Sequence, residues 1–290
     1  MDNPIFMKFV TVTIFSLMFA IGVNHSYDQL TSLWRRPDLL LRSLLAVVVL
    51  VPLVAVAILW LFDLPPTVAT GLAVLASAPG APLTTKRAQM AAGDPYYAAS
   101  LQLMLVLLAV VATPLTLAIF YALFDLSTEG VTPFKIALQV GEVTFLPVVI
   151  GLLLQRFAPR VAKVIAKPVR MLANILFVLL FVLIGVMLAF VPNLRQMLNL
   201  GAMPIVAIIV MGGLAIAIGH LLGGPSEGQR SSLAIACIAR NAGLALFIAA
   251  LSDYGQRFVP TLLTYLLAGA VVAVPYSIWR KHRMKGKDTP

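Results

Sequence analysis

Long apolar runs recur along this chain, and they dominate what it can fold into. The runs lie near residues 5–23, 38–62, 66–92, 96–124, 132–157, 168–190, 200–222, 229–250 and 258–279. A helix that crosses a bilayer needs about 20 mostly apolar residues. The pattern therefore predicts an all-α polytopic membrane protein with about nine transmembrane helices. The runs are separated by turn-like or charged stretches at residues 24–37, 65–66, 93–95, 127–130, 156–167, 223–228 and 252–257. These separators are too short to hold a soluble domain, so residues 1–290 form a single membrane unit.

The composition excludes the other broad classes of protein. Hydrophobic residues make up 61% of the chain and charged residues 11%, with a mean hydropathy of +0.99. Soluble domains carry roughly 25% charged residues, and disordered chains have low hydrophobicity. The single cysteine, Cys237, excludes a disulfide scaffold. The net charge of +10 is explained by basic loops, and no aromatic-interleaved basic face predicts binding to nucleic acid.

Basic residues gather on alternate loops and on the C-terminal tail. Those on one side of the membrane are Arg35, Arg36, Arg42, Arg156, Arg160, Lys163, Lys167, Arg170, Arg230, Arg280, Lys281, Arg283, Lys285 and Lys287. Because basic loops stay in the cytoplasm, the C-terminus is expected inside and the N-terminus outside. The first run lacks a basic start and a cleavage site for a secretory signal. Short loops and no cleavable leader favour a bacterial inner (plasma) membrane.

Two of the runs carry residues that interrupt a helix. The third contains Pro79, Gly80 and Pro82, and the eighth contains Arg240 and Asn241 in mid-span. Proline removes a helical donor, and backbone freed inside a bilayer must be satisfied by protein or a watery cavity. A pair of interrupted spans in two halves of a chain is typical of a transporter site at the membrane midplane. Segments 66–92 and 229–250 are therefore expected to be broken, crossing helices.

Arg240 is the most informative single residue, about ten residues from either end of its run. A basic side chain at the bilayer centre costs roughly 2.5–3.5 kcal/mol on insertion scales. It could pair with Glu142, which is equally deep in its own run. Alternatively, it could face the crossing point and attract an anion or replace a bound cation. No metalloprotease, P-loop or serine-hydrolase motif is present, so no enzyme, cofactor or metal site is expected.

Several motifs carry a resemblance to a known family. They are MFAIGV at 18–23, RRPDLLL, Pro52, LFDLPPTVATGLAVLASAPGAP, Gly93-Asp94, Thr113-Pro114 and RNAGLAL at 240–246. Together they make the chain resemble the bile acid:sodium symporter family. The resemblance implies an inverted-repeat fold that works by alternating access. It also implies a panel part, residues 1–37 and 132–195, and a core part, residues 38–131 and 196–290.

The positions that hold sodium in the family are changed here. By the resemblance they are Val47, Thr84, Thr85, Ala98, Gln102, Ala236 and Arg240. Hydroxyl and carbonyl oxygens can still coordinate a hard cation. However, the family's key carboxylate is replaced by Ala236, and the glutamine beside Asn241 is replaced by Arg240. This local charge argues against sodium coupling of the family type.

The sequence predicts a secondary carrier of a small organic anion, a carboxylate or a sulfonate. The residues expected at the substrate site are Pro82, Thr84, Thr85, Lys86, Gln102, Arg240, Asn241, Ala242 and Gly243. Glu142 is the candidate for proton coupling, with a structural role as the alternative. Three other functions stay open, namely a sodium-coupled bile acid symporter-type carrier, an efflux permease and a non-transporting membrane sensor. The lipid bilayer is the expected partner, and the oligomeric state is left open.

Overall fold

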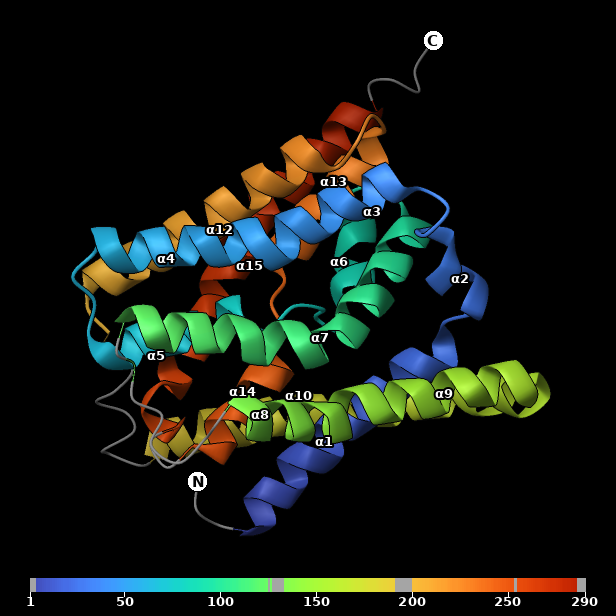
Figure 1. The fold of residues 1–290 in the computed structure, drawn as a ribbon, viewed down its shortest axis with the longest axis horizontal. Helices are drawn as coiled ribbons and strands as arrows, with labels where there is room; N and C mark the ends of the chain where they lie inside the picture. The colour runs from blue at the N-terminus through green and yellow to red at the C-terminus, as the bar shows by residue number, and fades with distance from the viewer. Residues whose placement is uncertain (1–3, 125, 127–132, 191–199, 253–254, 286–290) are drawn as a thin grey trace.

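The computed structural model describes residues 4–124, 126, 133–190, 200–252 and 255–285, and every element within them is helical (Figure 1). Eight helices are long and apolar enough to cross a membrane, by length and composition. They span Ile5–Asn24, Pro37–Leu61, Pro95–Phe124, Phe134–Phe157, Pro159–Met187, Ala202–Leu222, Glu227–Leu251 and Val259–Met284. The third predicted run, residues 66–92, forms two shorter helices instead. The all-α polytopic fold with two interrupted helices is thus confirmed.

The first half of the chain builds one interrupted helix between continuous ones. Its elements are α1 (Pro4–Asn24), α2 (Tyr27–Ser32), α3 (Pro37–Leu44), π-helix η1 (Leu45–Leu50), α4 (Val51–Leu61), α5 (Pro66–Ala76), α6 (Thr84–Met90) and α7 (Pro95–Phe124). The second half continues with α8 (Pro133–Val140), π-helix η2 (Gly141–Phe145), α9 (Leu146–Phe157), α10 (Pro159–Phe190), α12 (Ala202–Leu222), α13 (Glu227–Ile238), α14 (Ala242–Leu251), the short η3 (Gly255–Arg257) and α15 (Val259–Lys285).

The helices pack as two groups with α5, α6 and α7 between them (Figure 1). Helix α1 packs against α9 and α10, and α9 also contacts α10. In the other group, α12 packs against α4, α13 and α15, and α15 contacts α5. Helix α7 touches both groups through α6 and α8. Helix α2 crosses from the end of α1 to α7.

Two separators differ from the sequence-based expectation. Residues 156–167 were expected to be a loop, but α10 already begins at Pro159. This first part is amphipathic, since Ala162 is buried while Arg160 and Lys163 are exposed, so the basic residues lie on a solvated helix face. Separator 24–37 contains α2, whose start has a capping box made by Ser26 and Gln29. Separator 127–130 lies outside the described residues.

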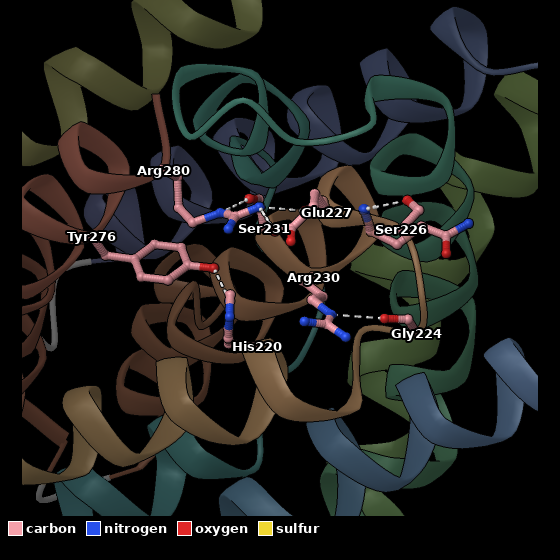
Figure 2. A network of polar contacts seen from close by, with 9 residues as sticks. His220, Gly224, Ser226, Glu227, Arg230, Ser231, Tyr276 and Arg280 are labelled. Atoms are coloured by element: carbon pink, nitrogen blue, oxygen red, sulfur yellow. Dashed lines mark hydrogen bonds and ion pairs between the residues drawn. The ribbon is translucent and has the colours of Figure 1, made fainter. Parts of the chain in front are cut away.

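A polar network fastens the C-terminal helix to the start of α13 (Figure 2). Arg280 is fully buried, and its Nη2 lies 2.6 Å from a carboxylate oxygen of Glu227. Its Nε donates to the Ser231 hydroxyl at 2.8 Å, and Nη2 also donates to the Glu227 carbonyl at 2.9 Å. Ser226 caps α13 by accepting the Gln229 amide. Arg280 is therefore an anchor of the fold, and counting it with the basic tail was wrong.

Each π-helix is followed by a proline one residue into the next helix. In η1 the Val51 amide donates to the Ala46 carbonyl, five residues back, and the next residue, Pro52, has no amide hydrogen. The Val47 carbonyl therefore has no donor within its own helix. The same pattern occurs in η2, where Leu146 donates to Gly141 and Pro147 follows. The bulge and the proline together free the Glu142 carbonyl from the helix ladder.

Candidate substrate site at the crossing of the interrupted helices

The two interrupted helices break where the sequence places proline, glycine and arginine. Helix α5 ends at Ala76 and α6 begins at Thr84, so residues 77–83 are not helical. Gly80 adopts a φ of +78°, a backbone conformation that favours glycine. In the second half, α13 ends at Ile238 and α14 begins at Ala242. Both breaks free backbone groups in the middle of the protein, and those groups need partners.

Asn241 joins the two breaks with its backbone and its side chain. The backbone amide donates to the Ala78 carbonyl at 2.8 Å, and Nδ2 donates to the Gly80 carbonyl at 3.3 Å. The other side-chain atom, Oδ1, accepts the Leu244 amide at 3.1 Å and caps α14. Asn241 is fully buried, so these bonds hold the crossing together rather than offering free polar groups.

Arg240 reaches across the crossing and binds backbone carbonyls. Its Nε donates to Leu75 at 3.0 Å, Nη1 donates to Val47 at 3.2 Å, and Nη2 donates to Ala76. Leu75 and Ala76 lie in the last turn of α5, where the macrodipole is negative and carbonyls lose their partners in the helix. The Leu75 carbonyl also accepts the Ala78 amide at 3.0 Å. Val47 supplies the carbonyl freed by η1. The positive charge of the guanidinium is thus stabilised by the partial negative charges of three backbone carbonyl oxygens.

Glu142 does not lie beside Arg240. It sits on η2 with an exposed side chain, whereas Arg240 is buried at the crossing. Among the residues that the structure describes, no ion pair joins the two and no acidic group contacts the guanidinium. The suggested Arg240–Glu142 pair is therefore not formed. Backbone carbonyls replace the missing carboxylate as the compensation for a buried charge.

A cavity of about 750 Å³ lies beside the crossing, between α1, α2, α6, α7 and α10. Four residues expected at the substrate site line it: Pro82, Thr85, Lys86 and Gln102. Gln102 orders this wall, because its Nε2 donates to the Pro82 carbonyl at 2.7 Å and its Oε1 accepts the Thr85 hydroxyl. The Thr85 amide also points to the same Oε1, at 3.3 Å. Lys86, the next residue, is exposed to the cavity.

The other expected site residues lie away from the cavity. Thr84 is buried and its hydroxyl donates to the Ala81 carbonyl at 2.8 Å. Arg240 and Asn241 are used in the crossing, behind the cavity wall. Ala242 is buried beside them, and the Cα of Gly243 faces Ile14 of α1 and Phe177 of α10. The crossing and the cavity are thus adjacent but distinct parts of the site.

Several cavity residues were missed by the sequence analysis. They come from α1, α2, α6, α7 and α10 and their ends, and the polar ones are Asn24, His25, Gln29, Gln89, Tyr96, Arg170 and Asn174. Polar residues at the edges of apolar runs were the available signal. The described lining contains Lys86 and Arg170 and no aspartate or glutamate. The potential in the cavity is therefore positive, and it favours an anionic ligand.

His25 directly follows the end of α1 and lines the cavity. Its Nδ1 lies 2.7 Å from the Ile21 carbonyl. Burial lowers the pKa of His25, and the bond to this carbonyl opposes that effect only in part. The ring is therefore neutral at pH 7, and it adds a polar but uncharged group to the cavity.

The positions that hold sodium in the resembling family are occupied by internal contacts here. Val47, Ala98 and Ala236 are buried and offer no side-chain oxygen. The hydroxyls of Thr84 and Thr85 are engaged with Ala81 and Gln102. Gln102 is engaged with Pro82 and Thr85, and Arg240 brings a positive charge. The side chains at these positions thus supply no carboxylate to a cation.

The fold and the site define a polytopic helical membrane protein with a ligand cavity at a crossing of two interrupted helices. Residues 11–194 match the family model described as "Sodium Bile acid symporter family". The chain belongs to this family of membrane transporters, and it is an integral membrane protein. It is also similar to an uncharacterized sodium-dependent transporter, YocS, of Bacillus subtilis (strain 168), with 24% identity over 150 residues. That match covers 52% of this chain and 46% of the relative.

Proposed function

We propose that this protein is a secondary transporter that carries a small organic anion by alternating access and does so without sodium. The observation that carries the proposal is the guanidinium of Arg240 on three carbonyls at the crossing. A permanent cation there does what a bound cation would do for those carbonyls, and it opposes the binding of a second positive ion. The relative's description as sodium-dependent makes this a testable difference between the two chains.

The choice of an anion is supported by the cavity itself. Lys86 and Arg170 face the cavity from α6 and α10, and the side-chain amide of Asn174 adds a hydrogen-bonding group. The Asn24 and Gln102 side-chain amides already donate to backbone carbonyls and shape the wall. A carboxylate or sulfonate placed between the two cations would be desolvated in part and held by charge-assisted hydrogen bonds. The direct contacts to the anion then come from Lys86 and Arg170, while Arg240 positions the crossing.

Alternating access is supported by the location of the cavity. It lies between α1 and α10 on one side and α6 and α7 on the other. We assign α1 and α10 to the panel part, residues 1–37 and 132–195, and α6 and α7 to the core part. Movement of the core along the panel would open the cavity to one side of the membrane at a time. Such rigid-body rocking around a fixed site is common in secondary transporters.

The orientation belongs to the same proposal. The cavity is bordered by the ends of α1 and α6 and by the start of α10, near the basic residues 156–170. By the charge rule this end is cytoplasmic, with the N-terminus outside and the C-terminus inside a bacterial plasma membrane. A reporter that is active only in the cytoplasm should therefore be active when it is fused to residue 290. A reporter that is active only outside the cytoplasm should be inactive at this position.

The decisive test is sodium dependence in two assays. Thermal unfolding of the purified protein should be the same in sodium, potassium and choline chloride at equal ionic strength, since a bound ion would raise stability. Uptake of a panel of organic anions into sealed proteoliposomes should also be independent of sodium. A sodium-specific rise in both melting temperature and uptake would overturn the sodium-independent mechanism. Absence of flux for every anion would overturn the transporter assignment.

A gain-of-function variant gives the matched control. The double variant Ala236→Glu/Arg240→Gln restores a carboxylate and removes the fixed charge at two neighbouring positions of the crossing. It should acquire a sodium-dependent rise in melting temperature that the wild type lacks. The single variant Ala236→Glu should not, because its new carboxylate would pair with Arg240.

Cysteine labelling tests the cavity directly. The native thiol, Cys237, is completely buried, so labelling of the wild type should be slow. In Gln89→Cys the new thiol lies on the cavity wall, outside the proposed anion contacts, and a small maleimide should react with it from the cytoplasmic side. A transported anion should slow this reaction, whereas it should not protect a cysteine placed on the lipid-facing residue Val178.

A further inference from the structure

A second concave surface lies on α10 and faces away from the helix bundle. It has a polar head formed by Lys167, Arg170 and Asn174 and an apolar floor formed by Met171, Ile175, Val178 and Leu179. Its volume is about 540 Å³. We call it the α10 groove.

The apolar floor is unusually open for a packed helix. Met171 is 62% exposed, Val178 59% and Leu179 50%. In a membrane-spanning helix such side chains contact acyl chains. The two basic side chains lie one turn apart above this floor, because residues i and i+3 share a helix face. The groove therefore presents two positive charges at one end and an acyl-chain surface at the other.

We propose that the α10 groove binds an anionic phospholipid, with the phosphate on Lys167 and Arg170 and an acyl chain along the apolar floor. The charge pattern selects the ligand, because the described lining of the groove carries two cations and no acid. A zwitterionic headgroup would bring an ammonium group close to these cations, whereas a phosphatidylglycerol headgroup would not. Basic pockets on the cytoplasmic side of membrane helices bind anionic headgroups in this way.

The groove also connects to the main cavity. Arg170 and Asn174 line both of them, so one guanidinium faces the lipid on one side and the cavity on the other. A phosphate on Arg170 would withdraw this cation from a ligand in the cavity. The lipid therefore weakens anion binding in the cavity, a consequence that rests on the proposed function, whereas lipid binding itself does not.

Native mass spectrometry of the full chain tests lipid binding without any transport assay. The protein is equilibrated in detergent with equal amounts of phosphatidylglycerol and phosphatidylcholine of the same chain length. The wild type should retain phosphatidylglycerol preferentially. The variant Lys167→Gln/Arg170→Gln should retain it about 25-fold less, from about fivefold for each basic side chain near a membrane surface. Equal retention of both lipids by the wild type would overturn the proposal.

The matched control is Arg160→Gln/Lys163→Gln, which removes the same charge from exposed positions of the same helix outside the groove. It should retain phosphatidylglycerol as the wild type does. An equal loss of phosphatidylglycerol in the control would mean that retention depends only on net charge, and it would overturn the proposed lipid site. Glycerophosphoglycerol, which has the phosphodiester headgroup of phosphatidylglycerol without acyl chains, should fail to displace the lipid. Displacement at equal concentration would remove the role of the apolar floor.

The link to the cavity has its own measurement. Dissociation constants of a transported anion are compared in nanodiscs with and without phosphatidylglycerol. Affinity should fall when the lipid is present, and Lys167→Gln, which leaves the cavity lining intact, should reduce this fall. An affinity independent of lipid would overturn the link, while retention of phosphatidylglycerol in the mass spectra would still support the lipid site.

Discussion

Two arginines are buried in the described part of this membrane protein, and the fold compensates their charges in different ways. Arg280, near the end of α15, has a carboxylate partner in Glu227, which is 26% exposed. Arg240, at the centre of the crossing, has three backbone carbonyls and, within the described chain, no acid. The first solution is an ion pair at the edge of the bundle. In the second, the carbonyls at a π-bulge and at a helix end form a site for a positive charge, and the side chain of Arg240 occupies it.

The difference follows from what each position offers. Glu227 lies in the first turn of α13, where the positive end of the helix dipole stabilises a carboxylate. Water also reaches its side chain, so the desolvation cost of a carboxylate there is small. At the crossing, a second buried charge would be costly, but the end of α5 and the bulge η1 already present unpaired carbonyls. A guanidinium has five donors in a fixed plane and can satisfy several carbonyls together. The crossing therefore depends on arginine in particular.

Replacing Arg240 should have the largest effect. Arg240→Met leaves the carbonyls of Val47 and Ala76 without the donor that Arg240 supplies, and Leu75 with the Ala78 amide alone. Each buried unpaired group costs about 1–3 kcal/mol. We expect a loss of at least about 3 kcal/mol in stability together with loss of anion binding. Thermal unfolding in detergent and a binding assay measure the two. A variant that melts and binds like the wild type would contradict the role of Arg240 in holding the crossing.

Breaking the Arg280 pair should come next. Arg280→Met removes one partner of a buried pair, which costs about 3–5 kcal/mol when both partners are fully buried. The cost here should be smaller, about 1–3 kcal/mol, because Glu227 is partly solvated. The double variant Glu227→Gln/Arg280→Met should recover part of the loss. Anion binding, measured at a temperature where the variants are folded, should stay unchanged, since the pair is far from the cavity residues in the chain's fold.

Conservative lysine variants sharpen the comparison. Lysine carries a point charge and cannot reproduce the planar fork of arginine. Arg280→Lys can keep the ion pair and should cost about 1 kcal/mol. Arg240→Lys must give up at least one of three carbonyls on two separate elements and should cost about 2 kcal/mol. Equal melting temperatures for the two variants would mean that charge alone, and not donor number, stabilises the crossing.

The sequence is sufficient to predict the helices and the two breaks. Apolar runs of bilayer length fix the spans, and Pro79, Gly80 and Pro82 fix one break, because each acts on its own local backbone. The prediction that Arg240 lies at the crossing was also within reach. Its partners were not, since the free carbonyl of Val47 depends on a π-bulge and on Pro52 acting together. No side-chain pattern reveals a carbonyl without a donor.

The cavity shows a second limit of sequence reasoning. Pro82, Thr85 and Lys86 could be predicted because they follow the break directly and a cavity must adjoin it. Arg170 and Asn174 could not, because α10 is distant in sequence and only helix packing brings its face to α6. The same packing turns Gly243 toward α1 and α10 and away from the cavity. Helix rotation is a property of the whole bundle, and one helix's sequence does not determine it.

The smallest expected effect is a change of melting temperature with pH. It does not arise from either arginine, because a guanidinium group does not lose its proton in proteins. Burial lowers the pKa of His25 below its ordinary value of 6.5. The unfolded chain therefore takes up a proton more readily, so the stabilising contribution of neutral His25 is complete above pH 6.5 and is lost as the pH falls toward the lower folded pKa. Melting temperature should decrease over this acidic range, and His25→Gln should flatten that part of the profile. If the melting temperature of His25→Gln changes with pH as that of the wild type does, the titrating group lies elsewhere. If Arg240→Lys alters this pH profile and His25→Gln does not, proton binding is linked to the crossing.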